Sequence, residues 1–504
     1  MVVARERSSR LDEIYQLAAE LTERGKHEPA WKIIGKLLID NPLDIRALVI
    51  GSTILRNLEA YAQSYHLARC ATQVKPDSAA GWTVFGHVAA RMGLVDEAER
   101  HYKQGLRFAQ AQADKTAIWI NLSALYIDNG KFDQARHYVN KILSVDPTNK
   151  SALTNLGFCQ LAVKDWSGWK GYHGTIGCTW RKRVVYKDEP EWDGSPGKSV
   201  VLYADQGLGD EISFASMIPD AAAICRKLIV DCDGRLEGLF RRSFPQAKIY
   251  GTRVREEKWA KEDRQIDASL PLGQIGEYFR TTDESFPGTP YLVPCPERVK
   301  QWKALFAEKK KPCIGVAWTG GVPHNNSRNR RIALRDLMPV FELDAHFVSL
   351  QYKDAKQEIA TFREEHPHID LAQYPWATLT DDYDDTAALV ASLDAVVCIQ
   401  TAVGHTAGAL GKPVFVLLPT ATTWRYGLSG DSIPWYRSMT IIRQQKHGSW
   451  SEEIERAASS LVNLLGLRER AGTLTRVGSL RNNIHSVRAA SLGHHQANGS
   501  HPPA

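Results

Sequence analysis

Prolines recur along the first third of the chain at a nearly fixed distance. Pro42 and Pro76 stand 34 residues apart, and Pro147 follows 71 residues later, which is two further periods plus three residues. A period of this length predicts pairs of antiparallel helices that stack into an array. The unit marked by Trp82, Phe85, Gly86, Ala98 and Tyr102 recurs in the next unit as Trp119, Leu122, Ser123, Ala135 and Val139.

The pattern resembles the tetratricopeptide repeat family over residues 8–175. A degenerate first unit covers residues 11–44, and a last unit begins at "NKSALTNLGF". Gln110 stands where the family has proline, and the three extra residues near "AQAQADKT" lengthen one helix or loop. We interpret the Trp, Leu and Ala residues of the pattern as packing residues. An array of this kind offers a concave surface to another polypeptide.

From residue 199 onward, apolar strands alternate with helices. One half opens with "KSVVLYADQGLGDEISFASMIP" and a second opens with "CIGVAWTGG". This order predicts parallel sheets with crossover helices. We expect two doubly wound domains that face each other across a cleft, with ligands at the carboxyl ends of the strands.

Two phosphate-binding motifs fail in this region. Gly207 and Gly209 begin a G-x-G sequence, but Ile212 occupies the place of the third glycine of the dinucleotide fingerprint. In the Walker pattern, Pro413 follows Gly411-Lys412 where Ser or Thr would hold magnesium. Nicotinamide-binding and kinase interpretations therefore lose their main support.

The stretch "CIQTAVGHTAGALGKPVFVLLP", residues 398–419, predicts a strand, a polar turn, a short helix and a second strand. The first amides of a helix have no partner within it and attract an anion. The turn offers the hydroxyls of Thr401 and Thr406, the imidazole of His405, and at Gly404 a backbone open to a ligand. We predict a diphosphate there.

The same stretch resembles a known family, together with "YADQGLGDEISFASMIP", "GVAWTGGVPHNNSRNRRIAL" and "DDYDDTAALVASLD". These motifs are similar to glycosyltransferases related to lipopolysaccharide heptosyltransferases, and the architecture is similar to that of O-linked N-acetylglucosamine transferases. The resemblance implies a GT-B fold with an acceptor-side domain at residues 195–295 and a nucleotide-sugar donor domain at residues 310–468. A partly disordered tail is expected at residues 471–504.

The resemblance implies that Asp210, in the "GxGD" turn, is the catalytic base. A carboxylate there would remove the proton from an acceptor hydroxyl as it attacks the sugar. Helix capping by Asp210 is the structural alternative, and Glu211 is a weaker substitute for the base.

The donor side carries the remaining candidates. Relatives usually have Asp where this chain has Gln400, and often Lys where it has Asn325. One arginine of the basic loop is expected to neutralise the leaving diphosphate, with a solvated loop as the alternative. The candidate donor-binding residues are Gln400, Thr401, Gly404, His405, Thr406, Trp318, Gly320, Arg328, Arg330 and Arg331; candidates for contacts to the base or the sugar are Gln206, Gly207, Trp424 and Arg425.

No metal or other cofactor is expected beyond the nucleotide-sugar as co-substrate. The D-x-D sequence in "DDYDD", residues 381–385, is typical of metal-dependent glycosyltransferases, but we interpret it as capping the next helix through Asp385. The eight cysteines form no C-x-x-C pair and have no His at metal spacing.

Charge and hydropathy constrain the partners. A net charge of +6 over 504 residues indicates neither a nucleic-acid nor a membrane-surface footprint, and no apolar run approaches a transmembrane length. We therefore expect a cytoplasmic glycosyltransferase whose repeats select a protein acceptor, such as flagellin or another appendage subunit by family analogy. Transfer to a polysaccharide or lipid-linked glycan, and a non-catalytic repeat scaffold with a decayed transferase half, stay open as alternatives.

Overall fold

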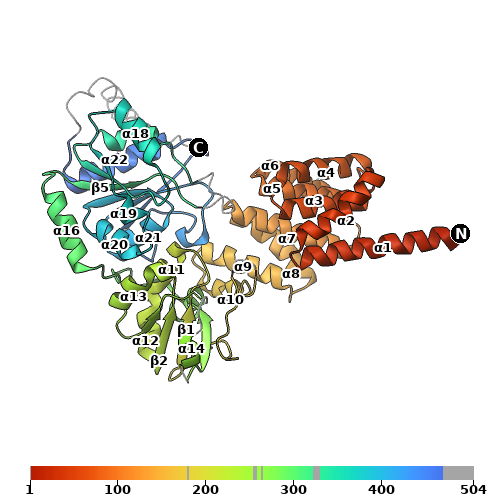
Figure 1. Cartoon of the computed structure of the whole chain (residues 1–504), viewed down its shortest axis with the longest axis horizontal. Coiled ribbons are helices and arrows are strands. Elements are labelled where there is room, and N and C mark those ends of the chain that lie inside the picture. The colour runs from red at the N-terminus through yellow and green to blue at the C-terminus, as the bar shows by residue number, and fades with distance from the viewer. Residues whose placement is uncertain (1, 179–180, 254–257, 263–264, 322–329, 469–504) are drawn as a thin grey trace, which may run out of the picture.

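A computed structural model describes residues 2–178, 181–253, 258–262, 265–321 and 330–468, with side chains from residue 11 onward. A helical array forms one side of the molecule, and two α/β domains lie one above the other on the opposite side (Figure 1). Among the residues described, none of the helices combines the length and the apolar character needed to span a bilayer.

The array confirms the predicted repeats. Its extra residues enter the first helix of one unit, because α7 has 17 residues where α3, α5 and α9 have 13. The helices are α1 (Val2–Glu23), α2 (His27–Asp40), α3 (Ile45–Asn57), α4 (Tyr61–Val74), α5 (Ala79–Arg91), α6 (Val95–Phe108), α7 (Gln112–Asp128), α8 (Phe132–Val145), α9 (Lys150–Ala162), η1 (Trp166–Gly168) and α10 (Trp169–His173).

Small residues set the distance between paired helices. A Cβ atom on Gly86 would lie 2.6 Å from the ring of Tyr102, and one on Gly157 would lie 2.6 Å from the carbonyl oxygen of Gly168. These contacts leave no space for a larger side chain. The small residue of the repeat pattern is therefore required by packing.

The first α/β domain contains four parallel strands in the order β3-β2-β1-β4. The order of the strands reverses between β1 and β4, which makes their carboxyl ends a switch point where ligands commonly bind. The elements are β1 (Ser199–Tyr203), α11 (Leu208–Phe214), α12 (Ile218–Ile224), β2 (Lys227–Asp231), α13 (Glu237–Ser243), β3 (Lys248–Tyr250), α14 (Lys258–Glu262), β4 (Ala268–Pro271) and α15 (Gly276–Phe279).

The second α/β domain has six parallel strands in the order β10-β9-β8-β5-β6-β7, with its switch point between β5 and β8. The predicted architecture, helical repeats followed by two parallel α/β domains, is thereby confirmed. The elements are α16 (Pro296–Ala307), β5 (Cys313–Ala317), α17 (Met338–Phe341), β6 (His346–Ser349), α18 (Lys356–Glu365), β7 (Leu371–Gln373), α19 (Pro375–Thr378), α20 (Tyr383–Ala391), β8 (Ala395–Ile399), α21 (Ala402–Ala409), β9 (Val414–Leu418), η9 (Trp424–Tyr426), β10 (Met439–Arg443) and α22 (Ser451–Leu465).

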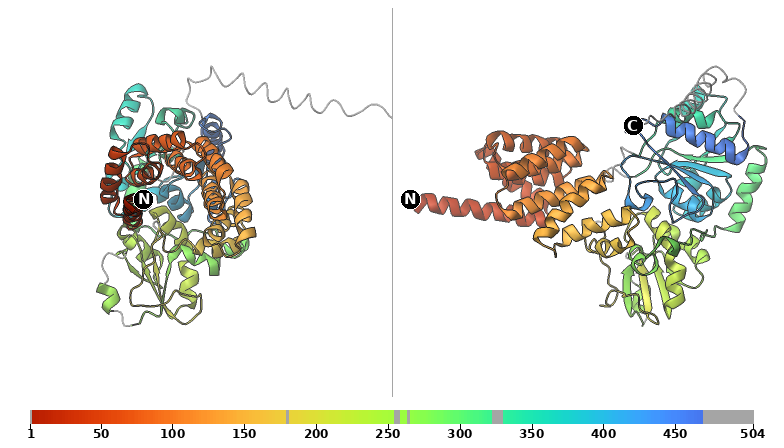
Figure 2. Two further views of the ribbon diagram at one scale, coloured as in Figure 1. Left: turned by 90° about the vertical axis from the view of Figure 1, so that its right-hand side faces the viewer. Right: turned by 180° about the vertical axis from the view of Figure 1, so that it is seen from behind.

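The three parts of the molecule share one apolar core. Trp169, at the end of the array, is fully buried, and its indole N–H donates to the carbonyl of Arg280 in the first α/β domain at 3.0 Å. Its ring centroid lies 5.3 Å from that of Trp424 in the second α/β domain. Seen from its end, the array curls in front of the α/β domains (Figure 2).

The docking of Trp169 depends on Gly276, because a Cβ atom at this position would lie 2.3 Å from the nearest carbon of the indole ring. We expect Gly276→Ala to lower the free energy of unfolding by about 1–3 kcal/mol through overpacking. Gly238→Ala is the matched control, since its Cβ atom would meet nothing within 4 Å. In helix α13 that control should be neutral or stabilising by up to about 1 kcal/mol. Chemical denaturation measures both changes, and equal effects would contradict the role of Gly276.

Candidate functional site

Helices α11 and α21, from different α/β domains, begin side by side. A Cβ atom on Gly209 would lie 3.2 Å from the Cα atom of Ala402 and equally close to the ring of His405. Glycine at this position therefore allows the two first turns to touch. The carboxyl ends of β1 and β8, which lead into these helices, meet at the same place.

Asp210 lies in the first turn of α11 and faces the second α/β domain. One carboxylate oxygen accepts the backbone N–H of Gly207 at 3.1 Å, and the other forms an ion pair with the guanidinium of Arg425. The helix begins at Leu208, and Asp210 caps it by accepting the N–H of its N-cap residue, as the structural alternative predicted. The Asp210 carboxylate therefore caps the helix and is also the candidate base.

Arg425 is held between aromatic rings. Its guanidinium carbon lies 5.2 Å from the ring centroid of Phe214 and 5.3 Å from that of Trp424. Burial opposes its charge, but the Asp210 carboxylate and the hydroxyls of Tyr172, Tyr426 and Tyr436 together outweigh burial and raise the pKa of Arg425. The Nε atom of Arg425 has no hydrogen-bond partner among the residues described. This donor is available to a further acceptor.

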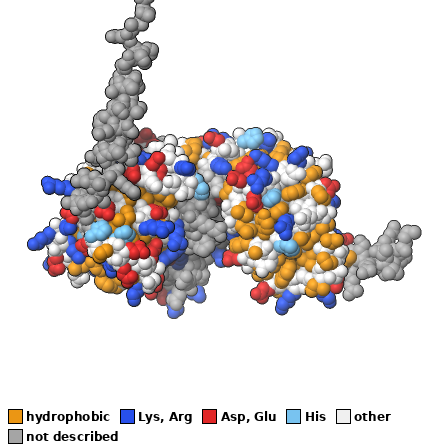
Figure 3. All heavy atoms as spheres, turned by 90° about the horizontal axis from the view of Figure 1, so that it is seen from above, with side chains coloured by type: hydrophobic (Ala, Val, Ile, Leu, Met, Phe, Trp, Pro, Cys, Tyr) orange, Lys and Arg blue, Asp and Glu red, His pale blue; other side chains and the backbone are white. Residues whose placement is uncertain are grey.

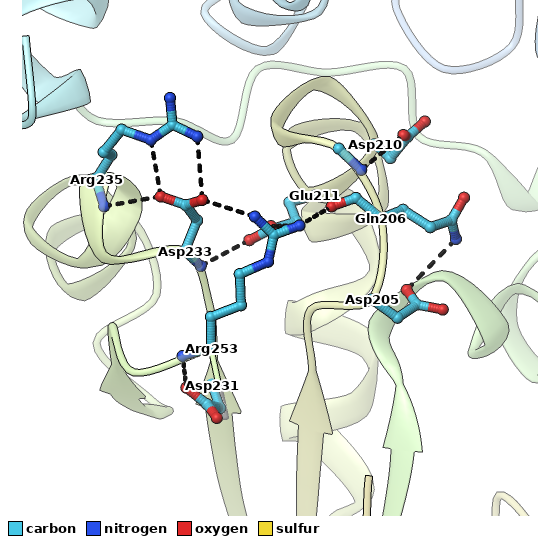
Figure 4. Close-up of polar contacts among 9 residues, drawn as sticks. Asp205, Gln206, Asp210, Glu211, Asp231, Asp233, Arg235 and Arg253 are labelled. Atoms are coloured by element: carbon cyan, nitrogen blue, oxygen red, sulfur yellow. Dashed lines mark hydrogen bonds and ion pairs between the residues drawn. The ribbon is translucent and has the colours of Figure 1, made fainter. Parts of the chain in front are cut away.

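Glu211 points to the opposite side of α11 from Asp210 (Figure 4). Its Oε2 atom accepts the backbone N–H of Asp233 at 2.9 Å, and its Oε1 atom lies 3.6 Å from Arg253. Burial raises the pKa of Glu211 to about 8. Glu211 therefore stabilises the first α/β domain through these contacts. Its side chain points away from the contact between α11 and α21, toward which a base that replaced Asp210 would have to point.

The described residues of the basic loop begin at Arg330. Burial lowers the pKa of Arg330, while Tyr426 and Asp210 oppose that shift, so its guanidinium lies within electrostatic range of Asp210. Arg331 is exposed, and its backbone forms an isolated antiparallel bridge with Thr319. Arg328 and Asn325 lie outside the described residues. Arg330 is therefore the member of this loop that the structure brings near Asp210.

His405 and Thr406 are not free turn residues as predicted. Helix α21 begins at Ala402, so both residues belong to the helix, and their side chains are buried. The two ring nitrogens of His405 each lie 3.2 Å from a tyrosine hydroxyl, and the Thr406 hydroxyl lies 2.9 Å from another; the tyrosines are Tyr436, Tyr426 and Tyr383. These contacts occupy the groups that the sequence assigned to a diphosphate.

Three other predicted donor residues have packing contacts. A Cβ atom on Gly404 would lie 3.1 Å from the sulfur of Cys398, so this glycine seats α21 on β8 rather than admitting a ligand. Trp318 is fully buried, and its indole N–H donates to Glu358 at 3.0 Å. Gly320 allows the loop after β5 to lie against the loop after β8, since its Cβ atom would be 2.7 Å from the carbonyl oxygen of Gln400.

Unpartnered polar atoms gather at the carboxyl ends of β5, β6 and β8. The Gln400 amide donates to Thr423 at 3.0 Å, but its Oε1 atom and the hydroxyl of Thr401 have no hydrogen-bond partner among the described residues. Gln351 likewise donates to Thr319 at 2.7 Å and leaves its own Oε1 atom without one. The sequence analysis missed Gln351, although its place directly after the strand "HFVSL" was a signal.

The predicted contacts to the base or sugar connect the site to the array instead. Gln206 accepts the hydroxyl of Tyr172 at 2.9 Å, and Trp424 packs edge-on against the same tyrosine. Gly207 is the N-cap residue of α11. Of these four candidates, Gly207 contacts Asp210 through its backbone N–H and Arg425 contacts it through its guanidinium.

The D-x-D sequence caps a helix, but not through the predicted residue. Asp382 is the N-cap of α20 and accepts the backbone N–H of Asp384 at 3.1 Å. Asp385 pairs with Arg298 at 3.0 Å instead. Asp384 pairs with Arg242 of the first α/β domain at 2.8 Å, so this motif joins the two domains. In the described ranges, no group of three or more His, Cys, Asp or Glu side chains is placed to hold a metal ion.

Comparisons with known proteins identify the array. A family model described as tetratricopeptide repeat matches residues 116–149. Protein FlbA of Caulobacter vibrioides is 27% identical over 463 residues, covering 86% of this chain and 75% of FlbA. The comparisons thus identify the repeats.

Solved structures match about 30% of this chain. The crystal structure of a thermophilic TPR protein from Thermus thermophilus is 23% identical over 29% of this chain and 80% of that chain, with a TM-score of 0.27. The APC/C hetero-tetramer Cut9-Hcn1 is 16% identical over 31% of this chain, with a TM-score of 0.29. That match spans 30% of the other chain.

The burial of His405 predicts a pH dependence of stability. Burial, and then the charge of Arg425, lower the pKa of His405 to about 3. In the unfolded chain, imidazole binds a proton below about pH 6.5, so folding loses stability at about 1.4 kcal/mol per unit as the pH falls from there toward 3.

Denaturation at pH 7.5 and pH 5 tests this expectation. At pH 5 the wild type should have lost about 2 kcal/mol more free energy of unfolding than His405→Gln, which has no imidazole to protonate. Other titrating groups are common to both proteins and cancel. Parallel stability profiles for the two proteins would show that His405 is not held neutral.

Proposed function

We propose that this chain is a GT-B glycosyltransferase that moves a sugar from a nucleotide-sugar to a hydroxyl of a protein acceptor, without a metal ion. The observation that carries the proposal is the meeting of Asp210, from the first α/β domain, with Arg425, from the second. A base and an anion-binding group from opposite domains are what such a transfer requires.

The chemistry assigns a role to each group. As the acceptor oxygen attacks the anomeric carbon, Asp210 takes its proton, and the bond between that carbon and the diphosphate breaks. Arg425 and Arg330 bind the departing diphosphate. Arg425 is paired with Asp210, so a bound diphosphate would compete for the guanidinium and release the carboxylate.

The repeat array would choose the acceptor, because its last helices form one wall of the same site. Trp424, the neighbour of Arg425, packs against Trp169 and Tyr172 of helix α10. A polypeptide on the array would therefore reach the site without crossing another domain. Flagellin or another appendage subunit is the acceptor class that we propose; a polysaccharide or lipid-linked glycan is the second.

A repeat scaffold without catalysis is the competing function. Gln400 favours it, since a neutral amide stands where relatives of the proposed family carry Asp. The two functions differ in donor binding, because a decayed domain should bind no nucleotide.

Calorimetric titration with uridine, guanosine, cytidine and adenosine diphosphates separates these functions. We expect one of them to bind, and Arg425→Gln to weaken its binding by about 1.5–3 kcal/mol through loss of a charged hydrogen bond. Arg456→Gln, on the exposed side of α22, is the matched control and should bind normally. Binding of none of the four by the wild type would favour the scaffold.

The base is tested by Asp210→Asn, which keeps the shape of the side chain but cannot accept a proton. We expect turnover to fall by roughly two to four orders of magnitude. Nucleotide affinity should be unchanged or higher, since Arg425 is no longer paired with a carboxylate. Glu211→Gln is the control, because Glu211 faces away from the junction, and it should transfer at close to the normal rate. A normal rate for Asp210→Asn would place the base elsewhere.

A further inference from the structure

The loop that carries Arg425 leaves strand β9 and returns to strand β10 in the same sheet. The two strands are parallel, and Leu418, the last residue of β9, lies opposite Arg443, the last residue of β10. Both residues therefore lie at the carboxyl edge of the sheet, where the loop begins. The side chain of Arg443 contacts the loop there.

The guanidinium of Arg443 binds four backbone carbonyls of this loop. Its Nε atom donates to the carbonyl oxygen of Gly430 at 2.8 Å, and its Nη1 atom donates to that of Gly427 at 3.2 Å. Its Nη2 atom donates to the carbonyl oxygen of Ser429 at 3.0 Å and to that of Tyr426. In the described ranges, no other hydrogen-bond donor of the protein reaches these four carbonyls.

This convergence of carbonyls requires both a special backbone and a cation. Gly427 has a φ of 66° and Gly430 a φ of 80°, in the left-handed region that glycine favours, so the loop can curl around the guanidinium. Carbonyl oxygens that point to one place repel one another through their partial negative charges. A planar guanidinium group, with five donors and a positive charge, offsets that repulsion and satisfies the acceptors together.

Arg443 differs from an ordinary surface cation. Over the face shown in Figure 3, Lys and Arg are interspersed with Asp and Glu. Arg443 is half-buried, burial lowers its pKa, and every hydrogen bond of its guanidinium to a described residue ends on a carbonyl of the loop. Its replacement should therefore affect the loop before any other part of the structure.

The held segment begins directly after Arg425. Tyr426 is fixed at two points, because Arg443 binds its carbonyl oxygen and its hydroxyl lies 3.2 Å from a ring nitrogen of His405. The guanidinium of Arg425 reaches Asp210 from this backbone. A long side chain holds a defined position only when the backbone that supports it is itself held.

We infer that Arg443 is a positioning residue: by binding the carbonyls of the loop from Tyr426 to Gly430, it holds Arg425 in place against Asp210. The use of this geometry to bind a diphosphate rests on the proposed function, whereas the placement of Arg425 does not.

A purely structural role for Arg443 is the alternative, in which the packing of Trp424 places Arg425 without help. Arg363 offers the matched case, because it lies on α18 of the same domain and its Nε atom donates to the carbonyl oxygen of Leu371 at 2.7 Å. It makes the same kind of bond outside the loop. General stabilisation predicts similar effects of replacing Arg363 and Arg443, whereas positioning sets Arg443 apart.

Limited digestion of the full chain with trypsin, followed by mass spectrometry, tests the inference without any nucleotide. Trypsin can cleave after Arg425 only when the loop opens, so the cleavage rate follows the population of the open loop. We expect Arg443→Gln to raise this rate by at least about tenfold through the lost hydrogen bonds to a charged group. Arg443→Lys keeps the charge but lacks the planar group, and its rate should lie between. Arg363→Gln should leave the rate unchanged.

Calorimetric titration of the same variants with uridine, guanosine, cytidine and adenosine diphosphates connects the loop to the site. The diphosphate that binds the wild type should bind Arg443→Gln several-fold more weakly, because only molecules with Arg425 in place bind it fully. Its affinity for Arg443→Lys should be partly restored, and its affinity for Arg363→Gln should be normal.

Three outcomes would overturn the inference: an unchanged rate of cleavage after Arg425 in Arg443→Gln, an equal rise in Arg363→Gln, or a faster cleavage with unchanged diphosphate affinity. If the wild type binds none of the four diphosphates, the transferase proposal fails, and the digestion still decides whether Arg443 places Arg425. Should Arg443→Gln fail to fold, Arg443→Lys decides. It must be cleaved faster after Arg425 but not after Arg363, and an equal rise at both sites rejects the positioning role.

Discussion

The aromatic contact between Trp169 and Trp424 holds the geometry of the site. Trp169 belongs to the last helix of the array, rests on Gly276 of the first α/β domain, and meets the second α/β domain at Trp424. Arg425 follows Trp424 directly, so this contact fixes the backbone from which the guanidinium reaches Asp210. Buried aromatic pairs add about 0.5–1.5 kcal/mol beyond their area burial. The array is thus a structural wall of the site.

The sequence was sufficient for the architecture because periodicity is a property of neighbouring residues. A 34-residue repeat and the alternation of apolar strands with helices predicted the array and the two parallel sheets, and the structure confirms both. The extra residues near "AQAQADKT", which were expected in one helix or loop, lengthen helix α7. These features depend on local spacing, which the sequence displays directly.

The role of a side chain depends on partners that are distant in the sequence. The prediction that His405 and Thr406 are free polar groups was therefore wrong. His405 and Thr406 looked like free polar groups after a strand, yet Tyr383, Tyr426 and Tyr436 bond to them from three separate segments. No local sequence pattern indicates that those tyrosines contact His405 and Thr406. The pairing of Asp210 with Arg425 joins residues far apart in the chain, and the sequence named both without connecting them.

The balance of charge at the junction suggests an order of events for the proposed transfer. Among the described residues, Asp210 is the carboxylate that acts on both Arg425 and Arg330, so two guanidinium groups share one negative charge. A nucleoside diphosphate brings at least two negative charges and several strong acceptors, so it competes well for both guanidinium groups. Asp210 then loses its cation and becomes a better proton acceptor, since a nearby positive charge stabilises the ionised form of a carboxyl group. Donor binding would thus prepare the base, and the acceptor hydroxyl would meet an active carboxylate only when a sugar is in place.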